Sequence, residues 1–186
     1  MNHYTRPGFD AWWIALGISA VVPVEIHWMM TNAWTHVGFI EPITRWLFPR
    51  LAQVYGFTST PSMPPKQKDV NARAQAARRV LKVAQKPGAI IAIAPEGRDH
   101  PGGILGTPPP GAGRFIHQLT KHCQLIVPIG VYDDMEHFYI HFGPPYQLES
   151  PADLLPDERD HHVTQQVMQS IAALLPPRLR GIYDPI

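Results

Sequence analysis

The chain has 186 residues, a length typical of one domain with a single core. Its 16 Lys and Arg residues nearly balance 15 Asp and Glu residues, and a net charge of +1 argues against a protein that binds nucleic acid mainly by neutralising phosphates. The one cysteine, Cys123, excludes an intramolecular disulfide, and the longest apolar stretch, residues 11–24, is too short to span a bilayer.

The first three expected elements lie in the N-terminal third of the chain. Residues 10–20 predict a helix that is capped by Asp10 and apolar nearly all round, so it should be buried or face lipid. Residues 23–30 have the composition of a strand. Residues 38–54 place apolar side chains three and four apart, which predicts an amphipathic helix interrupted near Pro49.

The middle of the chain predicts a helix, a strand and a second helix. The first helix, residues 70–85, has a cap candidate in Asp69 and a stop signal at Pro87. Its predicted inner stripe comprises Val70, Ala74, Ala77, Leu81 and Ala84. Residues 89–94 predict a buried strand, and residues 111–120 predict the second helix.

The C-terminal part predicts two strands and a long helix. Residues 124–131 are rich in β-branched side chains, and a polar turn at 133–136 separates them from a hairpin partner at 138–142. An amphipathic helix at about 157–175 follows. This order predicts an α/β fold in which a mostly parallel central sheet is covered by helices, formed as one domain over residues 1–186.

The strand predicted at residues 89–94 leads into Pro95-Glu96-Gly97-Arg98 and a loop rich in Gly and Pro. Proline ends the strand, and Gly97 permits a tight backbone path at the sheet edge where open α/β folds bind ligands. An Arg there can bind a phosphate through two parallel hydrogen bonds. From these residues alone, an ion pair between Glu96 and Arg98 that merely fastens the loop is the favoured alternative.

A second candidate site lies at the start of the chain, where His3 precedes Asp10. An imidazole oriented by a carboxylate is the standard arrangement of a general base that acts on a hydroxyl at neutral pH. Taken alone, a His at this position is more often part of a frayed terminus, and Asp10 only a helix cap. No pair of His residues has partners at diagnostic metal-ligand spacing, so no metal site is expected.

Four motifs occur in a set order over about residues 3–145. They are His3 with a following Asp, Pro95-Glu96-Gly97 with a nearby Arg, Ile126-Val127-Pro128-Ile129, and Phe142-Gly143-Pro144-Pro145. This ordered set resembles the glycerolipid acyltransferases that include lysophosphatidic acid acyltransferase. The resemblance implies a glycerol-3-phosphate acyltransferase-like fold, shortened at its N-terminus because the family usually has a strand before the His motif.

The resemblance also implies roles for the motif residues. His3 would be the base that deprotonates an acceptor hydroxyl, and Asp10 would orient the imidazole. Glu96, Gly97 and Arg98 would belong to the loop that binds the acceptor or its phosphate.

Two departures from the family pattern and one further role complete the comparison. Gly8 stands where the family usually has its Asp, and Asp10 follows two residues later. The family's usual Glu-Gly-Thr-Arg is Glu-Gly-Arg here, so Arg98 comes one residue early, and Arg114 could compensate. Pro128 would shape the acyl or acceptor pocket.

The implied activity is transfer of a fatty acyl group from an acyl-CoA or acyl carrier protein thioester to a hydroxyl of a lysophospholipid or glycerol-phosphate-like acceptor, with no other cofactor. A cytoplasmic protein, peripheral on the inner face of the membrane and without nucleic acid partners, is expected. The alternative is a catalytically impaired lipid-binding member of the same fold. A row of cations at Arg78, Lys82 and Lys86 could attract anionic lipid or coenzyme A phosphates, although a solvated helix face is the commoner interpretation.

Overall fold

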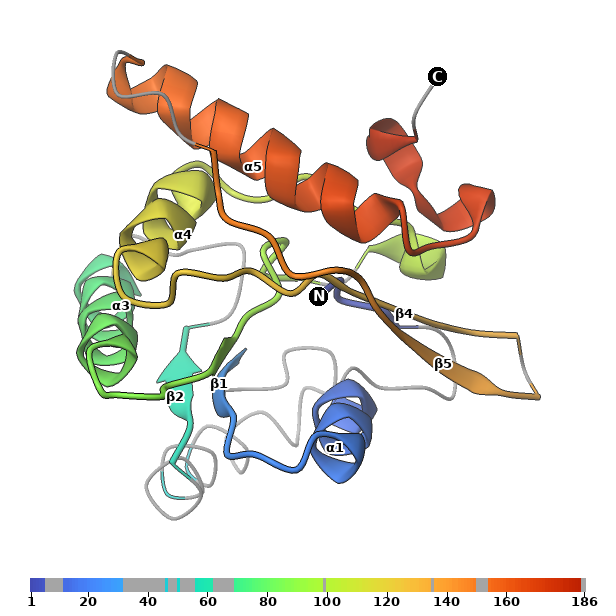
Figure 1. Cartoon of the computed structure of the whole chain (residues 1–186), viewed down its shortest axis with the longest axis horizontal. Coiled ribbons are helices and arrows are strands. Elements are labelled where there is room, and N and C mark those ends of the chain that lie inside the picture. Colours follow the sequence, from blue (N-terminus) through green and yellow to red (C-terminus); the bar gives the residue numbers. More distant parts are fainter. Residues whose placement is uncertain are drawn as a thin grey trace. The chain divides into compact units, whose positions relative to one another are not determined.

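A computed structural model describes residues 1–5, 12–31, 46, 50, 56–61, 69–98, 100–134, 136–149 and 154–184 (Figure 1). The chain divides into two compact units. The sheet unit comprises residues 25–93, and the hairpin unit comprises residues 1–24 and 94–186. The predicted mixed α/β class is confirmed, while the expectation of one domain over residues 1–186 stays a prediction.

Within its described residues, the sheet unit contains three short parallel strands in the order β2-β1-β3. The strands are β1 (His27–Thr31), β2 (Thr58–Thr60) and β3 (Ile91–Ala92). The helix α3 (Val70–Ala84) packs against β2. The strands predicted at 23–30 and 89–94 are therefore present in shorter form as β1 and β3. The strand β2, which the sequence pattern did not predict, lies at one edge of these three strands.

The helix α3 follows its predicted limits but buries a different stripe. Ala76, Val80 and Ala84 are buried, whereas Val70 is exposed, so the predicted inner stripe is wrong. Small and apolar residues occur around much of this helix, and packing against β2 selects one of two neighbouring stripes. Asp69 occupies the N-cap position, but its side chain makes no capping hydrogen bond.

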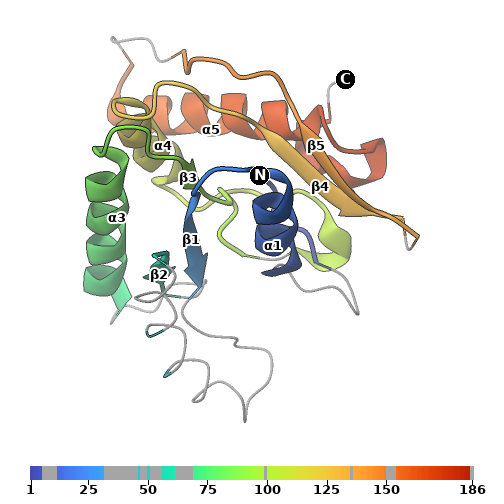
Figure 2. The same ribbon diagram turned by 60° about the horizontal axis from the view of Figure 1, so that its bottom comes forward.

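The hairpin unit combines helices with one antiparallel hairpin (Figure 2). Its main elements are α1 (Trp12–Val21), α4 (Ala112–Thr120), β4 (Ile129–Asp133), β5 (Phe138–Phe142) and α5 (Pro156–Ala172). Its described residues also form the 3-10 helices η2 (Pro101–Gly103), η3 (Pro177–Leu179) and η4 (Gly181–Tyr183). The helices α4 and α5 pack together, and a Cβ at Gly113 would overlap the Asp160 carbonyl, so their contact requires glycine there.

The strand β4 corrects two expectations. It was predicted at residues 124–131 within the parallel sheet, but it runs from Ile129 to Asp133 and, among the described residues, pairs along its length with β5 alone. Asp133 is therefore the buried last residue of a strand and not part of the polar turn predicted at 133–136.

A side chain occupies the other edge of β4. The Asn2 amide donates to the Val131 carbonyl at 2.8 Å, and its oxygen accepts the Val131 N–H at 2.7 Å. The N–H and C=O of one strand residue point to the same side, so these groups point away from β5. Asn2 thus takes the place that a neighbouring strand would need.

Two expected features fall largely outside the described residues. Asp10 lies outside them, as does most of the helix predicted at 38–54. Trp46 and Arg50, which are described, are both helical. Over the ranges that the structure describes, no helix has both the length and the apolar character needed to cross a membrane.

Candidate functional site

The motif Pro95-Glu96-Gly97-Arg98 forms a tight turn shortly after β3. The Gly97 N–H donates to the Ala94 carbonyl at 3.1 Å, and Gly97 has a φ of 67°, a left-handed conformation that favours glycine. The Glu96 side chain turns into the protein and is 1% exposed, whereas Arg98 is exposed. The two charged side chains therefore lie in different environments.

The buried Glu96 carboxylate accepts hydrogen bonds from two distant backbone groups. One oxygen, Oε2, accepts the His3 N–H at 2.6 Å, and the other, Oε1, accepts the Gly106 N–H at 2.6 Å. Short bonds to a charged acceptor are among the strongest in proteins, and they compensate the cost of burying the charge. His3 and Glu96, two predicted site residues that are 93 positions apart, are thereby brought together.

The loop that carries Glu96 is also held by the first residues of the chain. A Cβ at Gly103 would overlap the Tyr4 ring, so this ring packs directly on the loop backbone. The Tyr4 hydroxyl donates to Asp133 Oδ1 at 2.8 Å, and both side chains are buried. Residues 2–4 alternate buried, half-buried and buried, so Asn2 and Tyr4 both point inward.

The C-terminal residues hold the loop from another direction. The Leu105 N–H donates to the Leu179 carbonyl at 2.8 Å. Burial raises the pKa of Tyr183, a hydrogen bond with Thr107 opposes this effect, and the charge of Glu96 adds to it. The Tyr183 hydroxyl is therefore a neutral group at physiological pH, within electrostatic reach of Glu96.

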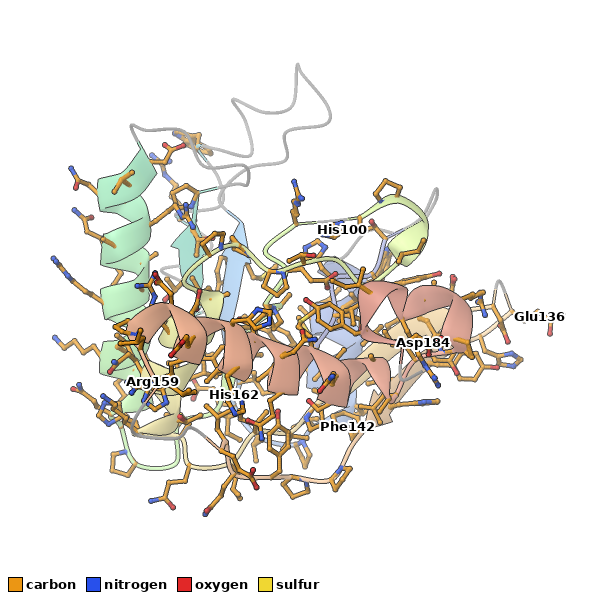
Figure 3. All side chains as sticks on the ribbon, turned by 90° about the horizontal axis from the view of Figure 1, so that it is seen from above. His100, Glu136, Phe142, Arg159, His162 and Asp184 are labelled. Carbon is orange, nitrogen blue, oxygen red and sulfur yellow. The ribbon has the colours of Figure 1, made fainter. Side chains whose placement is uncertain are left out.

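Two imidazoles belong to this region. His3 is half-buried, and its Nδ1 atom is buried. His100 lies on the loop between β3 and α4 (Figure 3), and a Cβ at Gly106 would overlap its ring. The His100 ring thus covers the backbone at the residue that donates to Glu96.

The predicted phosphate-binding residue Arg114 lies in the first turn of α4 beside α5. Its backbone N–H donates to Asp160 Oδ1 at 2.8 Å, and its exposed guanidinium lies 3.8 Å from Asp157 Oδ1. The other Asp160 oxygen accepts the Gly111 N–H at 2.7 Å. A carboxylate from α5 therefore occupies the positive end of α4, where a ligand anion would otherwise bind.

Pro128 lies buried at the base of the β4–β5 hairpin. Its carbonyl accepts the Gly143 N–H at 2.9 Å, and a Cβ at Gly143 would lie 2.8 Å from Pro128 Cγ. These contacts join two of the motifs that sequence reasoning singled out, and their immediate effect is to pack the hairpin base.

Sequence reasoning missed several residues that build the site, namely Asn2, Tyr4, His100, Asp133 and Tyr183. The sequence Asn2-His3-Tyr4 has no apolar–polar alternation, so it did not indicate that Asn2 and Tyr4 point inward. His100 belongs to the loop itself, whereas Asp133 and Tyr183 reach this region only through contacts with residues far away in sequence.

The arrangement suits proton transfer from a polar substrate group. It combines a half-buried imidazole, held through its own backbone by a buried carboxylate, with a loop that is anchored from both ends of the chain. In the parts of the chain that the structure describes, no three His, Cys, Asp or Glu side chains are grouped so that they could hold a metal ion.

No family model, no curated protein and no solved structure matches this chain.

Proposed function

We propose that this protein transfers a fatty acyl group from an acyl-CoA or acyl carrier protein thioester to a hydroxyl of a lysophospholipid or glycerol-phosphate-like acceptor. The observation that carries the proposal is the hydrogen bond of 2.6 Å between the His3 N–H and Glu96 Oε2. It holds the proposed base against the loop that, by resemblance to glycerolipid acyltransferases, would bind the acceptor. The corresponding glycerol-3-phosphate acyltransferase-like fold is part of the same proposal.

In the proposed reaction, the His3 imidazole takes the proton of the acceptor hydroxyl as its oxygen attacks the thioester carbonyl carbon. A new C–O bond forms, the C–S bond breaks, and the imidazolium returns the proton to the departing thiolate. The thioester is already a reactive acyl donor, so this route needs no acyl-enzyme intermediate. His3 is the catalytic residue of this scheme.

Glu96 acts as a positioning residue in this proposal. Both of its oxygens accept backbone N–H groups, from His3 and from Gly106. Its charge therefore holds the His3 backbone and the loop in one geometry, which keeps the base near the reacting hydroxyl. Arg98, exposed on the same turn, is the residue proposed to meet the acceptor phosphate.

Peripheral association with a membrane is part of the proposal. The helix α1 contains no charged residue, and Trp13 and Leu16 are 47% and 52% exposed although Ile14 and Ile18 are buried. Trp is enriched at membrane–water interfaces, and the exposed Leu16 adds apolar surface that a bilayer would cover.

A catalytically impaired lipid-binding module is the second candidate. Its support is the engagement of both Glu96 oxygens by backbone groups, which serves the fold whether or not His3 reacts. The same apolar surface of α1 would then serve binding alone.

Purified protein incubated with labelled acyl-CoA or labelled acyl carrier protein thioester, together with lysophospholipids or glycerol 3-phosphate, separates the two candidates. We expect labelled product, and we expect His3→Ala to lower kcat by a factor of about 10²–10⁴, the usual contribution of a general base. The matched control is His122→Ala, because His122 is an exposed histidine outside the site.

Two results would contradict the proposal in different ways. Undiminished transfer by His3→Ala would exclude His3 as the base. Folded protein that binds labelled lysophospholipid but yields no product with either type of donor would identify the lipid-binding module.

A further inference from the structure

We call four cations the cationic face: Arg78, Arg79 and Lys82 on the outer side of α3, and Lys86, two residues beyond the end of the helix. All four side chains are exposed, and α3 itself contains neither Asp nor Glu. Nitrogen-tipped side chains project outward from α3 in Figure 3. The feature is a local concentration of positive charge in a chain whose net charge is only +1.

The spacing of the cations puts them on one side of the helix. At 3.6 residues per turn, Arg78, Arg79 and Lys82 lie within an arc of about 100°. Lys86 follows directly after the C-cap residue Gln85. The buried stripe, which includes Val80, lies on the opposite side and packs toward β2. The cations therefore contribute little to the core of the sheet unit.

Few charges oppose the cationic face. Over the described ranges, none of its four residues forms an ion pair or hydrogen bond through its side chain. The exposed residues that share this side of α3, Asn71 and Gln75, are uncharged. The positive charge is thus not neutralised within the described structure.

We propose that the cationic face is the surface through which this protein rests on an anionic lipid bilayer. Clusters of four or more Lys and Arg on one helix face are typical of contact with anionic headgroups. A specific protein partner would need an apolar centre to its interface, and the exposed residues that share this side of α3, Asn71 and Gln75, are polar. The inference deepens the membrane association proposed above and rests on it.

The same unit exposes a second feature that suits the headgroup layer. Trp46 is 59% exposed, and the Arg50 guanidinium lies 3.9 Å from the centre of its ring. An indole paired with a guanidinium combines an apolar body with a charge that can meet phosphate. The sheet unit therefore offers both kinds of side chain that interfacial binding uses.

The test is flotation of the full chain with vesicles of phosphatidylcholine alone or mixed with an equal part of phosphatidylglycerol. We expect binding to the mixed vesicles alone, weakening as salt is added. Lys82→Gln should weaken it about fivefold and Arg78→Gln/Lys82→Gln roughly 25-fold, because each cation near an anionic surface contributes about 1 kcal/mol. The matched control, Lys121→Gln, removes the same charge from the exposed end of α4 and should change binding less than about twofold.

Several outcomes would overturn the inference. They are the absence of binding to anionic vesicles, equal losses from Lys82→Gln and Lys121→Gln, or capture of an acidic acyl carrier protein by this face with no affinity for vesicles. Vesicle binding is measured without an acyl donor, so it is independent of catalysis. If acyl transfer is absent but vesicle binding is intact and depends on Lys82, the result counts against the acyltransferase proposal alone. If acyl transfer to a soluble acceptor is retained but vesicle binding is absent, the result counts against this inference alone.

Discussion

The loop around Glu96 and the helix α3 use polar residues in opposite ways. In the loop region, the side chains of Glu96, Asn2 and Asp133 are buried, and each takes part in hydrogen bonds to a partner far away in sequence. In α3, the buried side chains are alanine and valine, and the cations face outward. Polar residues therefore determine the geometry of the Glu96 loop. On α3, the polar residues contribute little to the fold, and their charges are available to a partner.

The largest expected effect comes from Glu96→Ala. This change leaves the N–H groups of His3 and Gly106 without their acceptor, and each buried donor that loses its partner costs about 1–3 kcal/mol. We expect the free energy of unfolding to fall by about 2–6 kcal/mol in urea titrations. The control is Arg79→Ala on α3, which should change it by less than about 0.5 kcal/mol. Similar losses in both variants would remove the contrast between the two regions.

Val80→Ala tests whether the core of α3 depends on apolar packing. Val80 is fully buried, and the change removes two methyl groups and leaves a cavity. We expect a loss of about 2–3 kcal/mol, whereas Val70→Ala at the exposed start of the helix should cost less than about 0.5 kcal/mol. A larger loss from Val70→Ala would restore the inner stripe that the sequence pattern predicted.

Tyr4→Phe isolates one buried polar contact near the loop. The ring that packs on Gly103 is kept, and the hydroxyl that donates to Asp133 Oδ1 is removed. A loss of about 0.5–1.5 kcal/mol is expected from thermal unfolding. A variant as stable as the parent protein would indicate that Tyr4 acts here only through its ring.

The smallest effect should be a pH dependence that arises in the sheet unit. Burial lowers the pKa of His27, a hydrogen bond with the Gly56 backbone opposes this shift, and the positive charge of Lys86 adds to it. The His27 imidazole also shares a hydrogen bond of 2.8 Å with Thr58 Oγ1. The unfolded chain binds a proton on this residue near its ordinary value of 6.5, and the folded chain does so only at lower pH. The free energy of unfolding therefore falls as the pH drops below about 6.5 and is retained above it.

His27→Gln should flatten this pH dependence. Burial, Lys121 and Arg159 lower the pKa of His117 in the hairpin unit, so a double variant with His117→Gln should flatten the profile further. Burial also lowers the pKa of the Met1 amino group to about 6, so its contribution should remain in the double variant. An unchanged pH profile in His27→Gln would show that the imidazole is equally protonated in both states.

The sequence predicted the helices better than the strands. The patterns at 70–85, 111–120 and 157–175 correspond to α3, α4 and α5 with small shifts at their ends, because helical periodicity and stop signals are local. The strand predicted at 124–131 is displaced to Ile129–Asp133, whereas its predicted hairpin partner at 138–142 is confirmed as β5. Strand register depends on which chain lies alongside, and local composition does not contain that information.

The candidate site was predictable only in part. The ordered motifs pointed to His3 and Glu96 as site residues. They also predicted an imidazole–carboxylate pair of His3 and Asp10, and Asp10 lies outside the described residues. The bond that links His3 to Glu96 runs through the His3 backbone, which no residue pattern can announce. Arg114 was expected near a phosphate, and the structure gives it the carboxylates of α5 as neighbours.

By itself, the sequence determined the α/β class, the limits of the long helices and the position of a tight turn at Gly97, because each follows from a few neighbouring residues. Only the tertiary structure decided which stripe of α3 is buried, that Asn2 lies along the edge of β4, and that Glu96 turns inward while Arg98 faces solvent. The physical reason is common to all three. A buried polar or apolar side chain takes the direction in which a distant segment supplies its partner, and that partner is chosen by the packing of the chain as a whole.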